Sequence, residues 1–396
     1  MLVIAAPGQG AQTPGFLSPW LELPGFADRL AAWSDLAGVD LIRCGTTADA
    51  DEIRDTAVAQ PLLVAAAIAA AESLTGEQVP LKGLTAVVAG HSVGELAAGA
   101  IAGTISPESA MRLVKVRARG MAAAAAAVPT GMTAVLGGDQ EQVLAAIEAR
   151  GLTPANINGS GQIVAAGTLA ALAEFAADPP PKTRLRPLTV AGAFHTSFMA
   201  PAVEALGRAA ATVPSSDPVL ALLSNLDGAR VRTGADWLQR IVAQVSSPVR
   251  WDSCTQAMAR MGASAFIELP PAGTLTGLVR RALSGLEILA LKTPDDLSAA
   301  RQMLAEHASA PDASHAPEWR LLVAAGAGTF RAAGDGTQAA GAAVAAGAVL
   351  GQVEARGGGH QVAPTFAGTI IEWLVEDGDP VGAAQPLLRL LPDGRE

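Results

Sequence analysis

The 396-residue chain contains no tyrosine, only four lysines and only two cysteines. Cys44 and Cys254 stand alone, without the C-x-x-C spacing of a zinc site or the cysteine density of a disulfide-rich domain. We therefore expect no metal and a reducing compartment. The net charge of −10 provides no basic excess for phosphate backbones, so nucleic acid is not an expected partner.

Long hydrophobic runs are also missing, although 50% of the residues are hydrophobic. No stretch reaches the ~20 consecutive apolar residues of a membrane-spanning helix. The apolar run at 2–5 lacks the basic region and cleavage site of a secretory signal. These features predict a cytoplasmic protein with a large core and no membrane partner.

Strand and helix patterns alternate along the first part of the chain, which is typical of a parallel α/β sheet. We expect strands at 2–6 and 85–89, and a helix at 58–74. The pattern resumes later with a strand at 265–269 and a helix at 275–283. Residues 1–128 and 191–306 are therefore predicted to form one α/β core.

Residues 129–190 have a different rhythm, with six shorter elements in the order β-α-β-β-α-β. This order is typical of a ferredoxin-like subdomain, here inserted into the core. The expected strands are 132–136, 153–158, 162–166 and 184–190, and the expected helices are 139–150 and 170–177.

The last part of the chain lacks helical patterns. Residues 307–318 have the composition of a linker, and 319–396 predict a small all-β domain. Its expected strands are 319–324, 349–353, 369–375 and 387–391. Gly328-Thr329 recurs as Gly368-Thr369, which indicates an internal repeat.

The most informative motif is Gly90-His91-Ser92-Val93-Gly94, which follows an apolar run and precedes a helix-forming stretch. A strand, a G-x-S-x-G turn and a helix form a nucleophile elbow, whose sharp turn exposes the serine oxygen. The motif predicts a nucleophilic Ser92. The alternative is a serine that only caps the following helix.

A nucleophilic serine requires a base, and the chain has five histidines. Two fall in the linker and one in the tail, and His91 should point away from its neighbour Ser92. Elimination leaves His195 as the expected base. The alternative is a buried histidine with a purely structural role.

The stretch 106–127 predicts a helix, and at ~100° per residue Arg117 falls on its apolar side. A buried guanidinium requires a partner, because stranding such a charge costs on the order of 3–5 kcal/mol. The partner is either an internal Asp or Glu or the carboxylate of a ligand, which arginine binds in a bidentate manner. Arg112, Lys115 and Arg119 fall on the opposite, solvated side.

Pro7-Gly8-Gln9-Gly10-Ala11-Gln12 directly follows the first strand. Free N–H groups there, together with the amide of Val93, could stabilise an oxyanion. An ordinary strand-to-helix loop is the alternative. The segment is neither G-x-G-x-x-G nor a P-loop, so nucleotide binding is unsupported.

Taken together, these motifs resemble the malonyl-CoA:acyl-carrier-protein transacylase family over residues 1–306. Glu268-Leu269-Pro270-Pro271 departs from it, because the family usually has glycine before the proline. The matching blocks, in the family's order, are Pro7-Gly8-Gln9-Gly10-Ala11-Gln12, Gln60-Pro61, Gly90-His91-Ser92-Val93-Gly94-Glu95, Arg117, Ala193-Phe194-His195, Pro248-Val249-Arg250-Trp251 and Thr274-Leu275-Thr276-Gly277-Leu278.

The resemblance implies an α/β-hydrolase-like core in which Ser92 and His195 form a dyad for ping-pong acyl transfer. By position, Gln244 would supply the backbone carbonyl that orients the histidine. The backbone amides of Gln9 and Val93 would form the oxyanion hole.

The resemblance also implies the substrates. Arg117 would hold the malonyl carboxylate of malonyl-CoA, and Phe194 would disfavour an α-methyl group. The acceptor would be the phosphopantetheine thiol of an acyl carrier protein in fatty-acid or polyketide synthesis, with no cofactor and a monomeric core. Carrier proteins are usually acidic, so Arg112, Lys115 and Arg119 are a candidate docking patch, or simply a solvated helix face.

The tail resembles a biotinyl/lipoyl-type domain. Such domains attach their cofactor to a lysine at a hairpin tip, where Gly357 stands here, and the last lysine of the chain is Lys292. No amide-linked cofactor is therefore expected, and docking, dimerisation or no role at all remain open for the tail. The matching segments are Glu354-Ala355, Ala363-Pro364-Thr365-Phe366-Ala367-Gly368-Thr369 and Val375-Glu376-Asp377-Gly378-Asp379-Pro380-Val381.

Two other functions fit parts of the sequence. A serine esterase or thioesterase has the same elbow, but it has no need of an inward arginine. The other possibility is a scaffold or carrier-binding protein whose enzymatic activity is incidental, with the tail as the part responsible for that role.

Overall fold

The computed structural model describes residues 1–308, 319–334, 339–355 and 358–393. The chain divides into two compact units, residues 1–310 and 311–396. The sequence places a linker at 307–318, but His307 ends helix α12 (Leu297–His307). Ala308 is fully buried and its carbonyl accepts a hydrogen bond from the Thr85 amide at 2.8 Å. These two residues therefore belong to the first unit, and 309–318 lie outside the described residues.

The first unit is built on a six-stranded sheet with the order β11-β10-β1-β2-β7-β8. β1 (Leu2–Ala6) pairs in parallel with both β2 (Ala86–Gly90) and β10 (Ala265–Glu268). The carboxyl ends of β1 and β2 therefore lie side by side, with Ala6 opposite Gly90. The other strands of this sheet are β7 (Ala221–Leu223), β8 (Arg230–Val231) and β11 (Glu287–Ala290).

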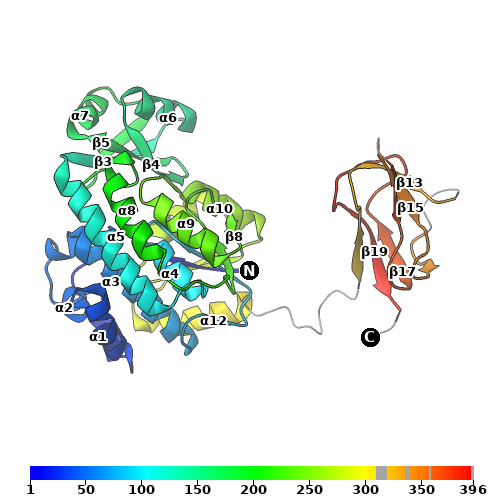
Figure 1. The fold of residues 1–396 in the computed structure, drawn as a ribbon, viewed down its shortest axis with the longest axis horizontal. Coiled ribbons are helices and arrows are strands. Elements are labelled where there is room, and N and C mark those ends of the chain that lie inside the picture. Colours follow the sequence, from blue (N-terminus) through cyan, green and yellow to red (C-terminus); the bar gives the residue numbers. More distant parts are fainter. Residues whose placement is uncertain (309–318, 335–338, 356–357, 394–396) are drawn as a thin grey trace. The chain divides into compact units, whose positions relative to one another are not determined.

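Helices cover both faces of this sheet, which explains why β1 and β2 are apolar at every position (Figure 1). Leu2 and Ile4 belong to one hydrophobic cluster, and Val3 and Ala5 to another on the opposite face. The core helices are α1 (Phe26–Ala37), α2 (Leu41–Thr46), α3 (Thr56–Thr75), α4 (Gly94–Ile101), α5 (Pro107–Ala127), α8 (Ala200–Ala210), α9 (Gly234–Gln244), α10 (Trp251–Arg260), α11 (Thr274–Ala282) and α12. Short 3₁₀ turns lie at Pro19–Glu22, Glu52–Arg54, Ser197–Met199 and Pro294–Asp296.

Helix α5 packs between α3 and α8 (Figure 1). Among the described residues, α3 is the one helix long and apolar enough to cross a membrane by length and composition. Its most apolar window is 83% buried inside the fold, as expected for the central helix of a core.

A smaller sheet forms from the middle of the chain, with the order β6-β3-β5-β4-β9. The strand β9 (Val249–Arg250) comes from the core sequence and pairs in parallel with β4, a pairing that the sequence did not predict. This sheet ties the inserted segment to the core. Its remaining elements are β3 (Thr130–Gly137), α6 (Gln140–Ala149), β4 (Thr153–Gly159), β5 (Gln162–Thr168), α7 (Leu169–Ala177) and β6 (Thr183–Pro187).

The second unit consists of two four-stranded antiparallel sheets with separate small cores around Phe330 and Ile370. One sheet contains β12 (Arg320–Val323), β19 (Pro386–Pro392), β17 (Gly368–Trp373) and β14 (Ala343–Val344). The other contains β16 (His360–Val362), β15 (Gly351–Glu354), β13 (Gly328–Ala332) and β18 (Pro380–Val381). Gly357, the expected hairpin tip, lies outside the described residues.

Candidate active site

Ser92 occupies a tight turn between β2 and α4, as the G-x-S-x-G motif predicts. Its φ of 53° is in the left-handed region, which residues other than glycine rarely adopt. The His91 amide donates to the Ala6 carbonyl at 3.0 Å, so the turn is fixed to the end of β1. A side chain on Gly94 would collide with that same carbonyl, which explains the glycine at this position.

His195 lies against this turn. Its Nε2 is 2.8 Å from the Ser92 Oγ, and its Nδ1 is 3.1 Å from the main-chain oxygen of Gln244. A carbonyl can only accept, so Nδ1 carries the proton and Nε2 is free to accept from the serine hydroxyl. The side-chain Nε2 of Gln244 is equally close to Nδ1, but its N–H would favour the opposite tautomer, in which His195 could not act as a base.

Burial keeps His195 neutral. Its side chain is 3% exposed, and burial, assisted by the charge of Arg117, lowers its pKa to about 3. The neutral imidazole is the form that can take a proton from Ser92. His91, by contrast, turns away from Ser92 and bonds through Nε2 to Asn158 Oδ1 at 3.0 Å.

The contact with Gln244 leads to the first prediction. Replacing Gln244 with alanine should lower kcat by less than about tenfold, because the main-chain carbonyl that orients His195 remains. Replacing His195 with alanine should remove about 10⁴-fold of the activity, because the base is lost. Steady-state kinetics of the two variants tests this. A Gln244→Ala loss as large as that of His195→Ala would show that the side chain, and not the carbonyl, orients the base.

Arg117 is 2% exposed and reaches the nucleophile from α5. Its Nη1 donates to Gln60 Oε1 at 2.7 Å, and its Nη2 donates to Ser92 Oγ at 3.1 Å and more weakly to Gln244 Oε1 at 3.4 Å. Within the described part of the chain, no carboxylate forms an ion pair with it. Burial lowers the pKa of Arg117 to about 10, and the charge of Glu95 opposes this shift. The groups that the guanidinium contacts directly are amide and hydroxyl oxygens.

The loop after β1 lies directly against the elbow. A Cβ on Gly8 would sit 2.9 Å from both Nδ1 and the carbonyl oxygen of His91, so this position also requires glycine. In the described segments, neither the Gln9 amide nor the Val93 amide donates to another protein group. A cavity of about 190 Å³ adjoins Gln9 and His91 and extends to Arg281.

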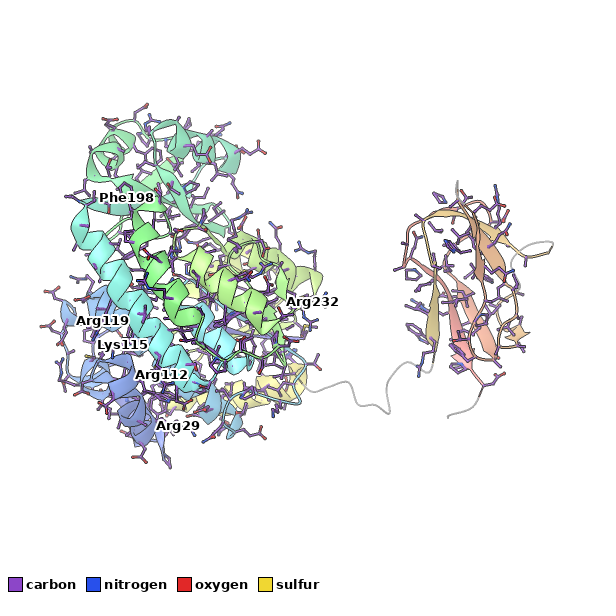
Figure 2. The ribbon with its side chains drawn as sticks, viewed as in Figure 1. Arg29, Arg112, Lys115, Arg119, Phe198 and Arg232 are labelled. Carbon is purple, nitrogen blue, oxygen red and sulfur yellow. The ribbon has the colours of Figure 1, made fainter. Side chains whose placement is uncertain are left out.

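The remaining predicted residues are Phe194 and the three basic residues of α5, and they differ in their burial. Phe194 is 6% exposed and packs in the main hydrophobic cluster. Arg112 and Arg119 are exposed along the outer side of α5 (Figure 2). Lys115 and Arg119 also approach Gly38, which caps the C-terminus of α1, where cations stabilise the last carbonyls. Lys115 is only partly exposed, and the docking patch and the solvated helix face both remain open for this side of α5.

Sequence reasoning missed several buried polar residues around the site. Asn225 binds the elbow through its side chain, and Asn158 binds His91. Glu268 is fully buried and its carboxylate accepts the amides of Gly273, Leu275 and Thr276, which caps α11. The only available signal was a polar residue at the end of an apolar strand, which does not identify a partner.

The fold and the hydrogen-bonded Ser92–His195 pair are the arrangement expected of enzymes that act on acyl groups through a serine. Residues 5–315 match the model of the acyl transferase domain family. The chain is 53% identical over 297 residues to the malonyl CoA-acyl carrier protein transacylase of Mycobacterium tuberculosis, covering 75% of this chain and 98% of that protein. It is 32% identical over 307 residues to the Escherichia coli K12 protein of the same name, covering 75% and 97%.

Solved structures agree with these relatives. The crystal structure of the Mycobacterium tuberculosis enzyme has a TM-score of 0.72 at 51% identity, covering 76% of this chain and 99% of that one. A complex of a malonyl-transacylase with its type II polyketide synthase acyl-carrier protein has a TM-score of 0.70 at 27% identity, covering 76% and 99%. The chain therefore belongs to the malonyl CoA-acyl carrier protein transacylase family.

Proposed function

We propose that this protein transfers the malonyl group of malonyl-CoA to the phosphopantetheine thiol of an acyl carrier protein, for fatty-acid or polyketide synthesis. The observation that carries the proposal is the buried guanidinium of Arg117, which lies 3.1 Å from Ser92 Oγ without a carboxylate partner among the described residues. A malonyl thioester brings a carboxylate to this position when its carbonyl carbon reaches the serine. Neither an acetyl group nor a simple ester would provide that charge.

The first half-reaction acylates Ser92. The hydroxyl loses its proton to Nε2 of His195, and its oxygen attacks the thioester carbonyl. The resulting oxyanion is stabilised by the backbone amides of Gln9 and Val93. The C–S bond then breaks, His195 returns the proton to the leaving sulfur, and free CoA leaves a malonyl ester on Ser92.

The second half-reaction reverses these roles. The carrier's thiol gives its proton to His195, and its sulfur attacks the malonyl ester on Ser92. The ester bond breaks, and the serine oxygen recovers the proton. Gln244 keeps the imidazole in the same tautomer through both steps, and Arg117 holds the malonyl carboxylate throughout. Phe194, adjacent to the base, would disfavour an α-methylated acyl group.

The alternative of a serine esterase or thioesterase has less support. Such an enzyme would use water as acceptor and would gain nothing from a buried cation at the nucleophile. The family membership also favours transfer.

The assay for this function supplies malonyl-CoA as donor and a phosphopantetheinylated carrier protein as acceptor. We expect the carrier to gain a malonyl group at a rate that depends on enzyme concentration, with little free malonate. Mass spectrometry of the carrier measures the transfer, and release of malonate measures hydrolysis. Free malonate without malonyl-carrier would identify a thioesterase instead.

We also propose a more detailed assignment of the two units. The order β6-β3-β5-β4 supports a ferredoxin-like subdomain at 129–190 inserted into an α/β-hydrolase-like core. The two antiparallel sheets of the second unit, with β12 and β19 adjacent, support a biotinyl/lipoyl-like domain. Because no lysine follows Lys292, that domain cannot carry amide-linked biotin or lipoate. We infer a cytoplasmic enzyme whose core acts as a monomer.

A further inference from the structure

Asn225 lies directly behind the nucleophile and is fully buried. Its Nδ2 donates to the Gly90 carbonyl at 2.7 Å, and its Oδ1 accepts from the Ser92 amide at 2.7 Å. One side chain therefore bonds to the elbow on both sides of His91. These two hydrogen bonds are as short as any neutral side-chain contact at the site.

The backbone of Asn225 is held equally firmly. Its amide donates to Glu95 Oε1 at 2.8 Å, and its carbonyl accepts from the Arg250 amide at 2.8 Å. All four polar groups of the residue are thus used, and none of the bonds goes to solvent. Glu95 follows the elbow on α4, so Asn225 is bound both to the turn and to the helix that begins there.

The strained conformation of Ser92 explains why the hydrogen bonds from Asn225 to the elbow matter. A serine at φ 53° is unfavourable and persists only where surrounding contacts determine it. The Asn225 side chain bonds to the amide of Ser92, so it fixes the peptide that precedes the strained residue. The backbone angles of Ser92 in turn set the direction of the next amide, that of Val93, which the proposed mechanism uses to stabilise the oxyanion.

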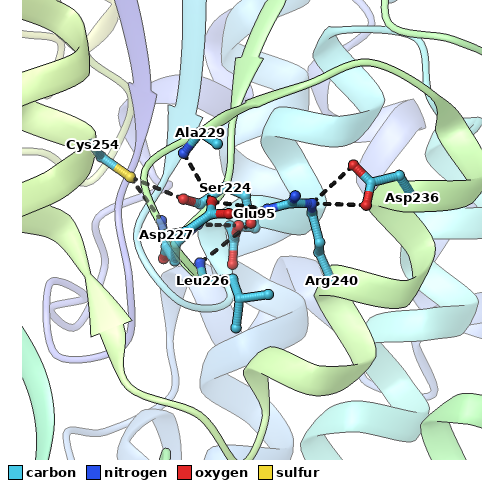
Figure 3. A network of polar contacts seen from close by, with 9 residues as sticks. Glu95, Ser224, Leu226, Asp227, Ala229, Asp236, Arg240 and Cys254 are labelled. Carbon is cyan, nitrogen blue, oxygen red and sulfur yellow. Dashed lines mark hydrogen bonds and ion pairs between the residues drawn. The ribbon is translucent and has the colours of Figure 1, made fainter.

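The segment around Asn225 also connects to the helix that orients the base. Asp227 and Asp236 both bind Arg240, as Figure 3 shows, with Arg240 Nη1 at 2.8 Å from Asp227 and Nε at 2.9 Å from Asp236. Arg240 lies one turn before Gln244 on α9, whose carbonyl contacts His195. The nucleophile and the base are therefore positioned by two neighbouring segments that an ion pair joins.

We propose that Asn225 is a positioning residue for acyl transfer: its carboxamide holds the elbow in the conformation that aims Ser92 Oγ at His195 and the Val93 amide at the oxyanion. The proposal rests on the proposed function for its acyl donor, but not for its geometry. Asn225 does not reach the acyl group, so it should affect the rate of acylation and not the binding of malonyl-CoA.

The test compares Asn225→Ala with wild type in rapid-mixing experiments. We expect the first-order acylation rate with malonyl-CoA to fall about 10²-fold, because misplacing a reacting group by about 1 Å costs that much. The dissociation constant from the concentration dependence should stay within about twofold. Asn225→Asp keeps an acceptor for the Ser92 amide and loses the donor to Gly90, so its rate should lie between the two.

The matched control is Cys254→Ser. Cys254 Sγ lies 3.6 Å from Nδ2 of Asn225 and donates to the Ser224 carbonyl, also part of the network in Figure 3. Serine can keep that bond and still provides an acceptor near Nδ2 of Asn225, so we expect both elbow bonds to remain and the variant to acylate at the wild-type rate. If Asn225→Ala does not fold by circular dichroism, the Asp variant decides the test.

A fluorophosphonate probe separates this proposal from the proposed function, because it labels an activated serine whatever the acyl donor. Slower labelling of Ser92 in the folded Asn225 variants supports the positioning role even if malonyl-CoA proves not to be the donor. A folded Asn225→Ala protein that reacts at the wild-type rate would overturn the proposal. So would a variant whose acylation rate is unchanged while its affinity for malonyl-CoA falls.

Discussion

Replacing Ser92 with alanine should abolish the malonyl adduct and lower malonyl transfer by about 10⁴-fold or more. Ser92 Oγ is the oxygen that lies 2.8 Å from the neutral Nε2 of His195, and no acyl-enzyme can form without it. The measurement is the intact mass of the protein after incubation with malonyl-CoA. Wild type should gain one malonyl group, and Ser92→Ala should gain none.

The control for this experiment is Ser197→Ala. Ser197 is an exposed serine two residues after His195, so its hydroxyl is close in sequence to the site but is not part of the proposed machinery. This variant should keep the full adduct. An adduct that persists in Ser92→Ala would place the nucleophile elsewhere and would contradict the mechanism.

The residues that the sequence predicted well are those with a local signature. The elbow is a strand, a turn and a helix in succession, and each part is specified by its neighbours in the chain. The inward direction of Arg117 followed from the helical period, and the structure confirms it: Arg117 is buried, whereas Arg112 and Arg119 are exposed. A period of 3.6 residues is enough to separate these side chains.

The residues that the sequence missed depend on contacts between distant segments. Asn225 is 133 positions from Ser92, and Asn158 is 67 positions from His91. Nothing in the local pattern around either residue indicates which polar group it meets, because that is decided by how strands and helices pack. The pairing of β4 with β9 also joins distant segments, and it was missed for that reason. In addition, β9 has only two residues, which is too short for a recognisable strand pattern.

Replacing Arg117 with methionine should lower kcat/KM for malonyl-CoA by about 10²–10³-fold and leave acetyl-CoA nearly unaffected. Removing one partner of a buried, hydrogen-bonded charge pair costs roughly 2–5 kcal/mol, and each 1.4 kcal/mol is about tenfold. Methionine keeps most of the volume of the side chain while removing its charge. Kinetics with the two donors measures the change in selectivity, and Arg112→Met on the exposed side of the same helix should change neither value.

The two donors also separate the two contacts of Arg117. The guanidinium also donates to Ser92 Oγ, so a loss through the nucleophile would reduce both reactions equally. Only a carboxylate clamp lowers the malonyl rate alone.

The thermal stability of the Arg117→Met variant provides an independent check. Burial holds the pKa of Arg117 below its ordinary value, so the charged form is destabilised in the ligand-free fold at neutral pH. Arg117→Met should therefore melt no lower than wild type, whereas a large drop in Tm would show that Arg117 is structural.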